Sequence, residues 1–102
     1  MPTVLLVRHG RTDTAAVLAG RTPGTRLDGV GRAQARSLAD RLAGVTLGAV
    51  VSSPLERCLE TATALTSERG RPAVEVDDRL TECDYGDWTG RTLATLARTK
   101  LW

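Results

Sequence analysis

Short aliphatic runs alternate along the chain with stretches in which apolar residues recur at helical spacing. The runs cover residues 4–7, 47–51 and 73–76. The first is aliphatic throughout, which predicts a strand buried on both faces, as in a parallel sheet. The third alternates apolar and polar residues, which is typical of a half-buried strand.

The stretch at residues 29–43 predicts an amphipathic helix. Asp28 precedes it as an N-cap and Gly44 follows it as a stop signal. Its apolar positions lie on one side of the helix, and they are Ala35, Leu38, Ala39 and Leu42.

A second helix is predicted to begin near Pro54 and to end near residue 68. Ser53 fits its N-cap and Glu56 follows three residues later, which together predict a capping box. Arg57 lies off the apolar stripe of this helix. Taken alone, such an arginine is most simply a solvated surface residue, and the alternative is that it points at a ligand.

Loops occupy much of the remainder of the chain. Residues 12–27 and 77–90 are rich in Gly, Pro and polar residues and predict long surface loops, and residues 92–102 predict a last helix. The order strand, helix, strand, helix, strand predicts an α/β fold whose mostly parallel sheet is flanked by helices.

Composition narrows the function classes. The net charge is +2 with only three aromatic residues, and the basic residues are spread along the chain, so a nucleic-acid partner is not expected. No apolar run approaches the roughly 18 residues of a membrane span, and no signal peptide precedes the first run, so we expect a cytoplasmic protein with no membrane partner. One histidine and two widely spaced cysteines predict no metal site.

His9 is the candidate for reactive chemistry. It follows the first predicted strand directly, between Arg8 and Gly10. Ligands of open α/β sheets bind at the carboxyl ends of strands, where such residues lie. A lone histidine is more often structural, but this setting favours a reactive imidazole.

Three segments together carry a family resemblance. Residues 6–12 (LVRHGRT), 52–57 (SSPLER) and 80–90 (LTECDYGDWTG) resemble, in order and separation, motifs of the histidine phosphatase superfamily, which includes the cofactor-dependent phosphoglycerate mutases. The resemblance spans residues 3 to about 91. It implies a phosphoglycerate mutase-like α/β fold and phosphomonoester hydrolysis or phosphoryl transfer, with no cofactor. The Trp-Asn extension of the mutases is missing after the first motif, which favours a phosphatase.

The resemblance also implies roles for residues. His9 would attack phosphorus and form a phosphohistidine, while Glu82 would serve as the acid–base group. The phosphate-binding candidates are Arg8, Arg57 and Thr12, because arginine forks match two phosphate oxygens and the hydroxyl can donate to a third. Gly10 is expected to turn the chain sharply and bring backbone N–H groups near the anion. The weaker substrate-binding candidates are Gly10, Arg11, Gly20, Arg21 and Tyr85.

The chain departs from the family in length and in its histidines. Family members are nearly twice as long and supply a second active-site histidine, which is missing here. We therefore expect residues 1–102 to be the amino-terminal part of a single, apparently truncated domain. Its first strand would lack a neighbour and expose apolar surface, which a homodimer could cover. Two functions stay open: an enzyme acting on a small phosphorylated substrate, and an incomplete fragment that binds phosphate or a partner.

Overall fold

A computed structural model describes residues 3–14, 16–68 and 70–98. After residues 4–7, where the predicted first strand is not formed, the elements follow the predicted order: α1 (Gly29–Arg41), β1 (Val50–Ser52), α2 (Glu56–Leu65), β2 (Val74–Val76) and α3 (Leu93–Leu96). Two short 3-10 turns, Asp78–Leu80 and Gly86–Trp88, lie in the loop between β2 and α3. The predicted α/β class is confirmed.

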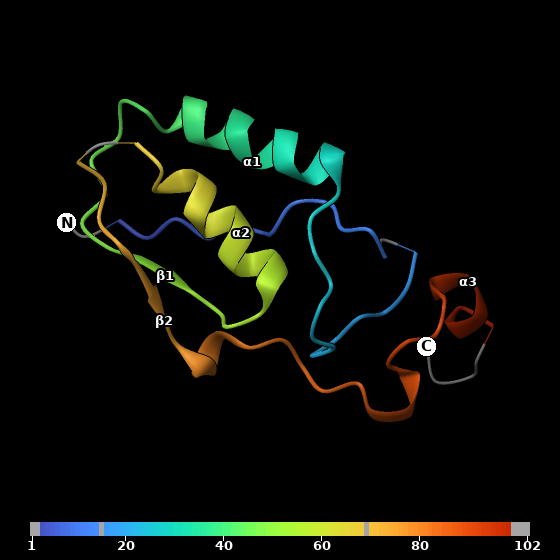
Figure 1. Cartoon of the computed structure of the whole chain (residues 1–102). Coiled ribbons are helices and arrows are strands. Elements are labelled where there is room, and N and C mark those ends of the chain that lie inside the picture. Colours follow the sequence, from blue (N-terminus) through green and yellow to red (C-terminus); the bar gives the residue numbers. More distant parts are fainter. Residues whose placement is uncertain (1–2, 15, 69, 99–102) are drawn as a thin grey trace.

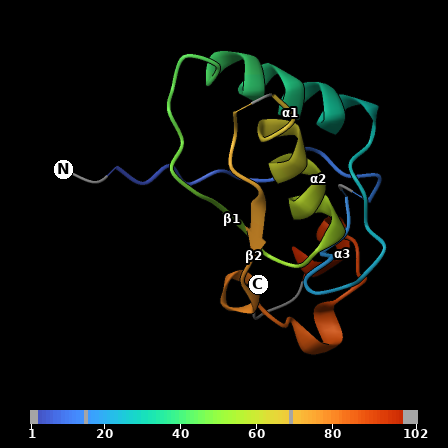
Figure 2. The same ribbon diagram turned by 60° about the vertical axis from the view of Figure 1, so that its left-hand side comes forward.

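The two strands form a parallel sheet, and a helix connects one strand to the other. Val50 pairs with Val74 and Ser52 with Val76, and α2 makes the crossover that a parallel pair requires. The crossover helix α2 packs against both strands and also against α1, so the helices form successive layers beside the sheet (Figures 1 and 2). This arrangement places the carboxyl end of β1 and the start of α2 beside the N-terminal segment.

The predicted strand at residues 4–7 is wrong within the described part of the chain. These residues are extended but pair with neither β1 nor β2, and the side chains of Val4 and Leu6 are 78% and 93% exposed. An aliphatic run favours burial, but a strand also needs a neighbour for its backbone hydrogen bonds, and no described segment provides one. The expectation that this segment exposes apolar surface is confirmed.

The predicted helix at residues 29–43 is confirmed, although it ends at Arg41. The Asp28 carboxylate accepts a hydrogen bond from the Gly31 N–H at 2.7 Å, as an N-cap does, and Ala35 is buried against α2. Beyond the other end, the Arg71 guanidinium donates to the carbonyl groups of Leu42 and Val45 at 2.6 and 2.5 Å. Leu42 is the C-cap of α1, so this side chain ties the turn after the helix to the segment that precedes β2.

The predicted capping box at Ser53 is wrong. The helix α2 begins at Glu56, its N-cap is Leu55, and no side chain caps it. The Glu56 carboxylate instead accepts the Gly24 N–H at 3.0 Å, while the Ser53 hydroxyl accepts the Leu55 N–H at 3.3 Å. Gly24 lies in the loop at residues 12–27, called the long loop below. The Glu56 carboxylate thus binds this loop and does not form the local capping box.

The contact of Glu56 with the loop predicts a pH-dependent contribution to stability. Hydrogen bonds from its own N–H and from the Gly24 N–H lower the pKa of Glu56. Because the folded-state pKa is depressed, the stabilisation is complete above the unfolded-state pKa and disappears as pH falls through the folded-state value. We expect Glu56→Gln to lower the urea midpoint at pH 7 and to differ less from the parent as pH falls below about 4. Glu68→Gln is the matched control, and a difference that stays constant with pH would contradict this account.

Three other features complete the fold. No helix in the described part of the chain is long and apolar enough to cross a membrane. Cys58 and Cys83 are free thiols. The last helix is confirmed from residue 93 to 96, capped by the Thr92 hydroxyl, but residues 97–98, predicted to continue it, form a turn. Residues 99–102 of the predicted helix lie outside the described residues.

Candidate active site

A cavity of about 540 Å³ opens where separate segments of the chain meet. It is lined mainly by the N-terminal segment, the long loop at residues 12–27, the first turn of α2 and the loop after β2, with one residue each from α1 and α3. All but one of the predicted site residues line it: Arg8, His9, Gly10, Arg11, Thr12, Gly20, Arg57, Glu82 and Tyr85. The exception is Arg21, which follows Gly20 in the long loop. The fold therefore brings together residues more than 70 positions apart in the chain.

The His9 imidazole is fixed through one nitrogen. Its Nδ1 lies 2.7 Å from the carbonyl oxygen of Gly10. A carbonyl oxygen only accepts, so Nδ1 must carry the hydrogen and donate it. In the neutral ring, Nε2 then has the free lone pair, which is the tautomer that a nucleophilic histidine requires.

Arg57 is buried rather than solvated, so the simplest interpretation of this residue alone is wrong. The residue is 3% exposed, and its Nη2 donates to the carbonyl oxygen of Gly20. Its Nη1 is also buried and has no hydrogen-bond partner in the described structure. A buried, unpaired guanidinium N–H is costly, and Arg57 lines the cavity that His9 lines. The arrangement fits an anion that accepts from Nη1.

Gly10 has a different role from the predicted one. Its φ is not positive, and its N–H donates to the Thr61 hydroxyl at 3.1 Å, so this amide does not face an anion. The Thr61 hydroxyl in turn donates to the Arg57 carbonyl at 2.9 Å. A Cβ on Gly10 would lie 2.5 Å from the carbonyl oxygen of Gly31 in α1. Glycine is needed here for close packing between backbones, and Thr61 ties the His9 segment to α2.

The remaining cations at the cavity differ in their availability. Arg8 is exposed, and it makes no hydrogen bond or ion pair with any described residue. Arg11 forms an ion pair with Asp28, with 2.7 Å between Nε and Oδ2, so its charge is compensated. Thr12 is 7% exposed and pairs with Leu27 through an isolated bridge across the base of the long loop. Of the cations, Arg8 and Arg57 are therefore the pair with capacity for a phosphate.

Glu82 lies at the cavity in the loop after β2. Its Oε1 accepts the Cys83 N–H at 2.8 Å and lies 3.4 Å from the Tyr85 hydroxyl. The negative charge of Glu82 raises the pKa of Tyr85, so the phenol remains a hydrogen-bond donor. The Glu82 backbone carbonyl accepts from Arg21 Nε at 2.6 Å.

Other residues line the cavity without having been predicted. The Gln34 side-chain oxygen accepts the Arg11 N–H at 2.9 Å and so holds the segment just after His9. Leu93, whose N–H donates to the Ala16 carbonyl, closes the side formed by the long loop. In the sequence, Gln34 looks like any polar residue on an amphipathic helix, and only the packing of α1 reveals its partner. The further unpredicted lining residues are Thr14, Val17, Leu18 and Ala19.

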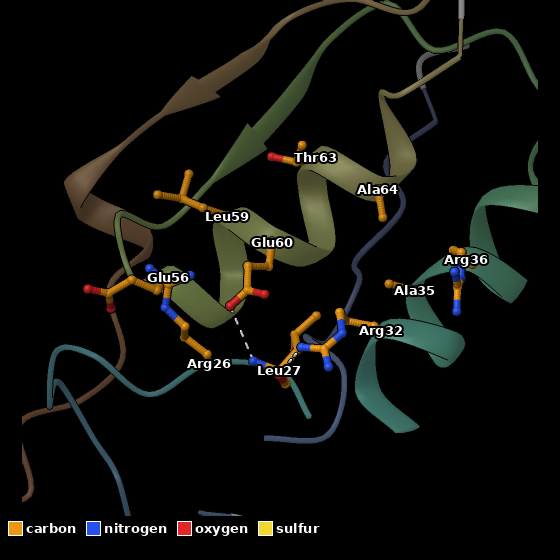
Figure 3. Close-up of a pocket in the computed structure, with 10 residues that line it drawn as sticks. All are labelled: Arg26, Leu27, Arg32, Ala35, Arg36, Glu56, Leu59, Glu60, Thr63 and Ala64. Carbon is orange, nitrogen blue, oxygen red and sulfur yellow. Dashed lines mark hydrogen bonds between the residues drawn. The ribbon is translucent and has the colours of Figure 1, made fainter. Parts of the chain in front are cut away.

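A second cavity, of about 440 Å³, lies between α1 and α2 (Figure 3). Arg26, Arg32 and Arg36 line it together with Glu56 and Glu60. Both glutamates bond to loop N–H groups, and the dashed line in Figure 3 marks the bond that Leu27 donates to Glu60 at 3.2 Å. This groove mixes both charges and holds none of the nucleophile candidates, so the cavity at His9 is the candidate active site.

Known proteins resemble this chain over most of its length. A glucosyl-3-phosphoglycerate phosphatase of Mycolicibacterium vanbaalenii is 41% identical over 92 residues, which cover 87% of this chain and 40% of that protein. The protein of the same description from Mycobacterium tuberculosis is 38% identical over 95 residues, covering 91% and 42%. The chain thus spans about 40% of the length of these curated relatives.

Solved structures show the same likeness. A mycobacterial glucosyl-3-phosphoglycerate phosphatase in complex with VO3 superposes with a TM-score of 0.79 at 38% identity, covering 86% of this chain and 44% of that one. A putative alpha-ribazole-5'-P phosphatase from Escherichia coli gives 0.79 at 34% identity, covering 93% and 48%. The model of the histidine phosphatase superfamily (branch 1) matches residues 4–102. The chain therefore belongs to the histidine phosphatase superfamily.

Proposed function

We propose that this chain carries the phosphate-binding and nucleophilic part of an enzyme that hydrolyses phosphomonoesters through a phosphohistidine at His9. The observation that carries the proposal is the buried, unpaired Nη1 of Arg57, a residue that lines the same cavity as His9 and Arg8. A phosphate dianion supplies acceptor oxygens and negative charge, both of which the guanidinium lacks.

The proposed reaction has two balanced steps. The lone pair of His9 Nε2 forms a bond to phosphorus as the bond between phosphorus and the ester oxygen breaks, and Glu82 gives a proton to the leaving oxygen. Water then attacks the phosphohistidine, the Glu82 carboxylate takes a proton from that water, and the P–N bond breaks. Inorganic phosphate leaves, and both residues return to their starting states.

The proposed substrate class is small phosphorylated molecules. The relatives described as glucosyl-3-phosphoglycerate phosphatases support this class, since they are 38–41% identical over most of the chain. Arg8 and Arg57 would bind the phosphate, with Thr12 as a hydroxyl donor. The rest of the substrate would contact the long loop and the Glu82 loop.

Trapping the covalent intermediate tests the proposal. The chain is mixed with p-nitrophenyl phosphate, quenched at alkaline pH, where phosphohistidine survives, and digested for mass spectrometry. We expect a phosphoryl group on the peptide that contains His9, and none in His9→Asn. Phosphate binding without this label would instead support the alternative, an incomplete fragment that binds phosphate. The label on another residue would overturn the assignment of His9.

Two further expectations stay predictions: a cytoplasmic location and a homodimer. The free thiols of Cys58 and Cys83 are compatible with the reducing cytoplasm. A homodimer would bury the exposed aliphatic residues 4–7. Sedimentation equilibrium measures the mass of the particle in solution and so distinguishes a monomer from a dimer.

A further inference from the structure

Arg21 differs from the other basic residues near the site in what it contacts. It is exposed and does not line the cavity, yet its Nε donates to the Glu82 backbone carbonyl at 2.6 Å, across 61 positions of sequence. Its partner is a backbone oxygen of the residue proposed as the acid. An arginine that bound substrate would instead direct its guanidinium into the cavity.

The loop that carries Glu82 is also tied to the long loop further along, where the Gly90 N–H donates to the Leu18 carbonyl and the Leu18 N–H donates to the Arg91 carbonyl. Positions 82–85 themselves have fewer ties. Its own hydrogen bonds are local, from the Cys83 N–H and the Tyr85 hydroxyl to the Glu82 carboxylate. Among the described residues, the Arg21 bond is the one hydrogen bond that reaches positions 82–85 from outside the loop between β2 and α3. Arg21 therefore supplies the hydrogen bond that fixes the acid's own segment, whereas the bonds at residues 90–91 fix the end of the same loop.

Gly20 links the same loop to the phosphate-binding arginine. Its carbonyl accepts from Arg57 Nη2, and its φ of +55° is one that glycine adopts without strain. A Cβ at this position would lie 3.0 Å from the Tyr85 ring, so the loop also packs closely against the Glu82 segment. Gly20 and Arg21 are consecutive, and one contacts the phosphate-binding arginine while the other contacts the acid.

We propose that Arg21 is a positioning residue, which with Gly20 forms a bridge that holds Glu82 in register with the phosphate bound at Arg57. This inference rests on the proposed function, because it assigns a role through Glu82. Removing the bridge displaces the acid and leaves the arginine clamp and His9 in place. The consequence falls on protonation of the leaving group rather than on phosphate binding.

Leaving-group dependence separates this role from a merely structural one. The p-nitrophenolate ion leaves without a proton, whereas an alkoxide needs one. For Arg21→Ala, we expect kcat for an alkyl phosphate to fall about ten- to a hundredfold. We expect kcat for p-nitrophenyl phosphate and the inhibition constant of inorganic phosphate to change less than about threefold, because this variant retains the arginine clamp.

Arg21→Lys, which keeps a donor on a flexible stem, should recover part of the loss. Arg26→Ala, from the same loop, is the control.

Equal losses on both substrates, or an unchanged alkyl phosphate rate, would overturn the positioning role. If the parent chain forms no phosphohistidine, the proposed function fails separately, and amide hydrogen exchange then tests the bridge. We expect the Cys83 amide to exchange about tenfold faster in Arg21→Ala, with the amides of α1 and α2 unchanged. Unchanged exchange at Cys83 would show that Arg21 does not hold this segment.

Discussion

Replacement of Arg57 with methionine is expected to reduce kcat/KM for phosphomonoesters about a thousandfold and to weaken inorganic phosphate binding at least tenfold. Loss of one preorganised donor at a site of developing charge costs about a hundred- to a thousandfold in rate. Arg57 supplies a buried cation as well as the unpaired Nη1, so we expect the upper end of that range.

The same substitution should affect stability far less than activity. Methionine loses the hydrogen bond to the Gly20 carbonyl, but it also removes a buried cation and its unpaired N–H group. These effects oppose each other, and we expect the free energy of unfolding to change by less than about 1.5 kcal/mol. Calorimetric titration measures phosphate binding, and urea unfolding of the same preparation measures the free energy of unfolding.

Two variants serve as controls for Arg57→Met: one keeps the charge at this position, and the other makes the same substitution elsewhere. Arg57→Lys keeps the cation but loses the two-pronged donor, so phosphate binding should be intermediate. Arg36→Met makes the same chemical change at an exposed arginine of α1 that lines the second cavity and not the cavity at His9, so it should leave phosphate binding unchanged. If Arg57→Met binds phosphate as tightly as the parent chain, Arg57 is a structural residue and the proposed anion site is wrong.

The features that could be predicted from the sequence depend on local chemistry. Asp28 caps α1 because a carboxylate three residues from an N–H group can reach it without tertiary help. The β1–α2–β2 crossover follows from the spacing of apolar runs, since a helix of that length returns the chain for a parallel strand. The three motifs meet at one cavity because the folded chain brings their loops to the same end of the molecule.

The failed predictions concern features for which distant segments compete. Residues 4–7 have a strand-like composition, but strand pairing depends on a neighbour that local composition does not specify. Glu56 has the spacing of a capping box, yet the Gly24 N–H takes its carboxylate across 32 positions. The burial of Arg57 depends on the Gly20 carbonyl, and a backbone acceptor leaves no residue-type signal in the sequence. The bond between Arg21 and the Glu82 carbonyl was undetectable for the same reason.

The contact between α1 and the segment after His9 gives the second large prediction. A Cβ on Gly31 would lie 1.9 Å from the carbonyl oxygen of Arg11 and 2.8 Å from its backbone nitrogen. Backbone atoms cannot rotate away as a flexible side chain would, so either α1 or residues 10–11 must move. Such overpacking typically costs 1–3 kcal/mol, and alanine's better helix propensity returns only about 1 kcal/mol. We expect Gly31→Ala to lower the free energy of unfolding by about 2 kcal/mol.

Gly29→Ala is the matched control, because it makes the same change at the first residue of the same helix. No heavy atom lies within 4 Å of a Cβ built there, so we expect no loss of stability and a gain of up to about 1 kcal/mol. Urea unfolding of the two variants isolates the contact from the effect of helix propensity. Because the clash is two residues from His9, Gly31→Ala should also weaken phosphate binding, whereas Gly29→Ala should not. Equal stability of the two variants would show that α1 is not held against residues 10–11. The cavity at His9 would then lack the rigid backing that this contact provides.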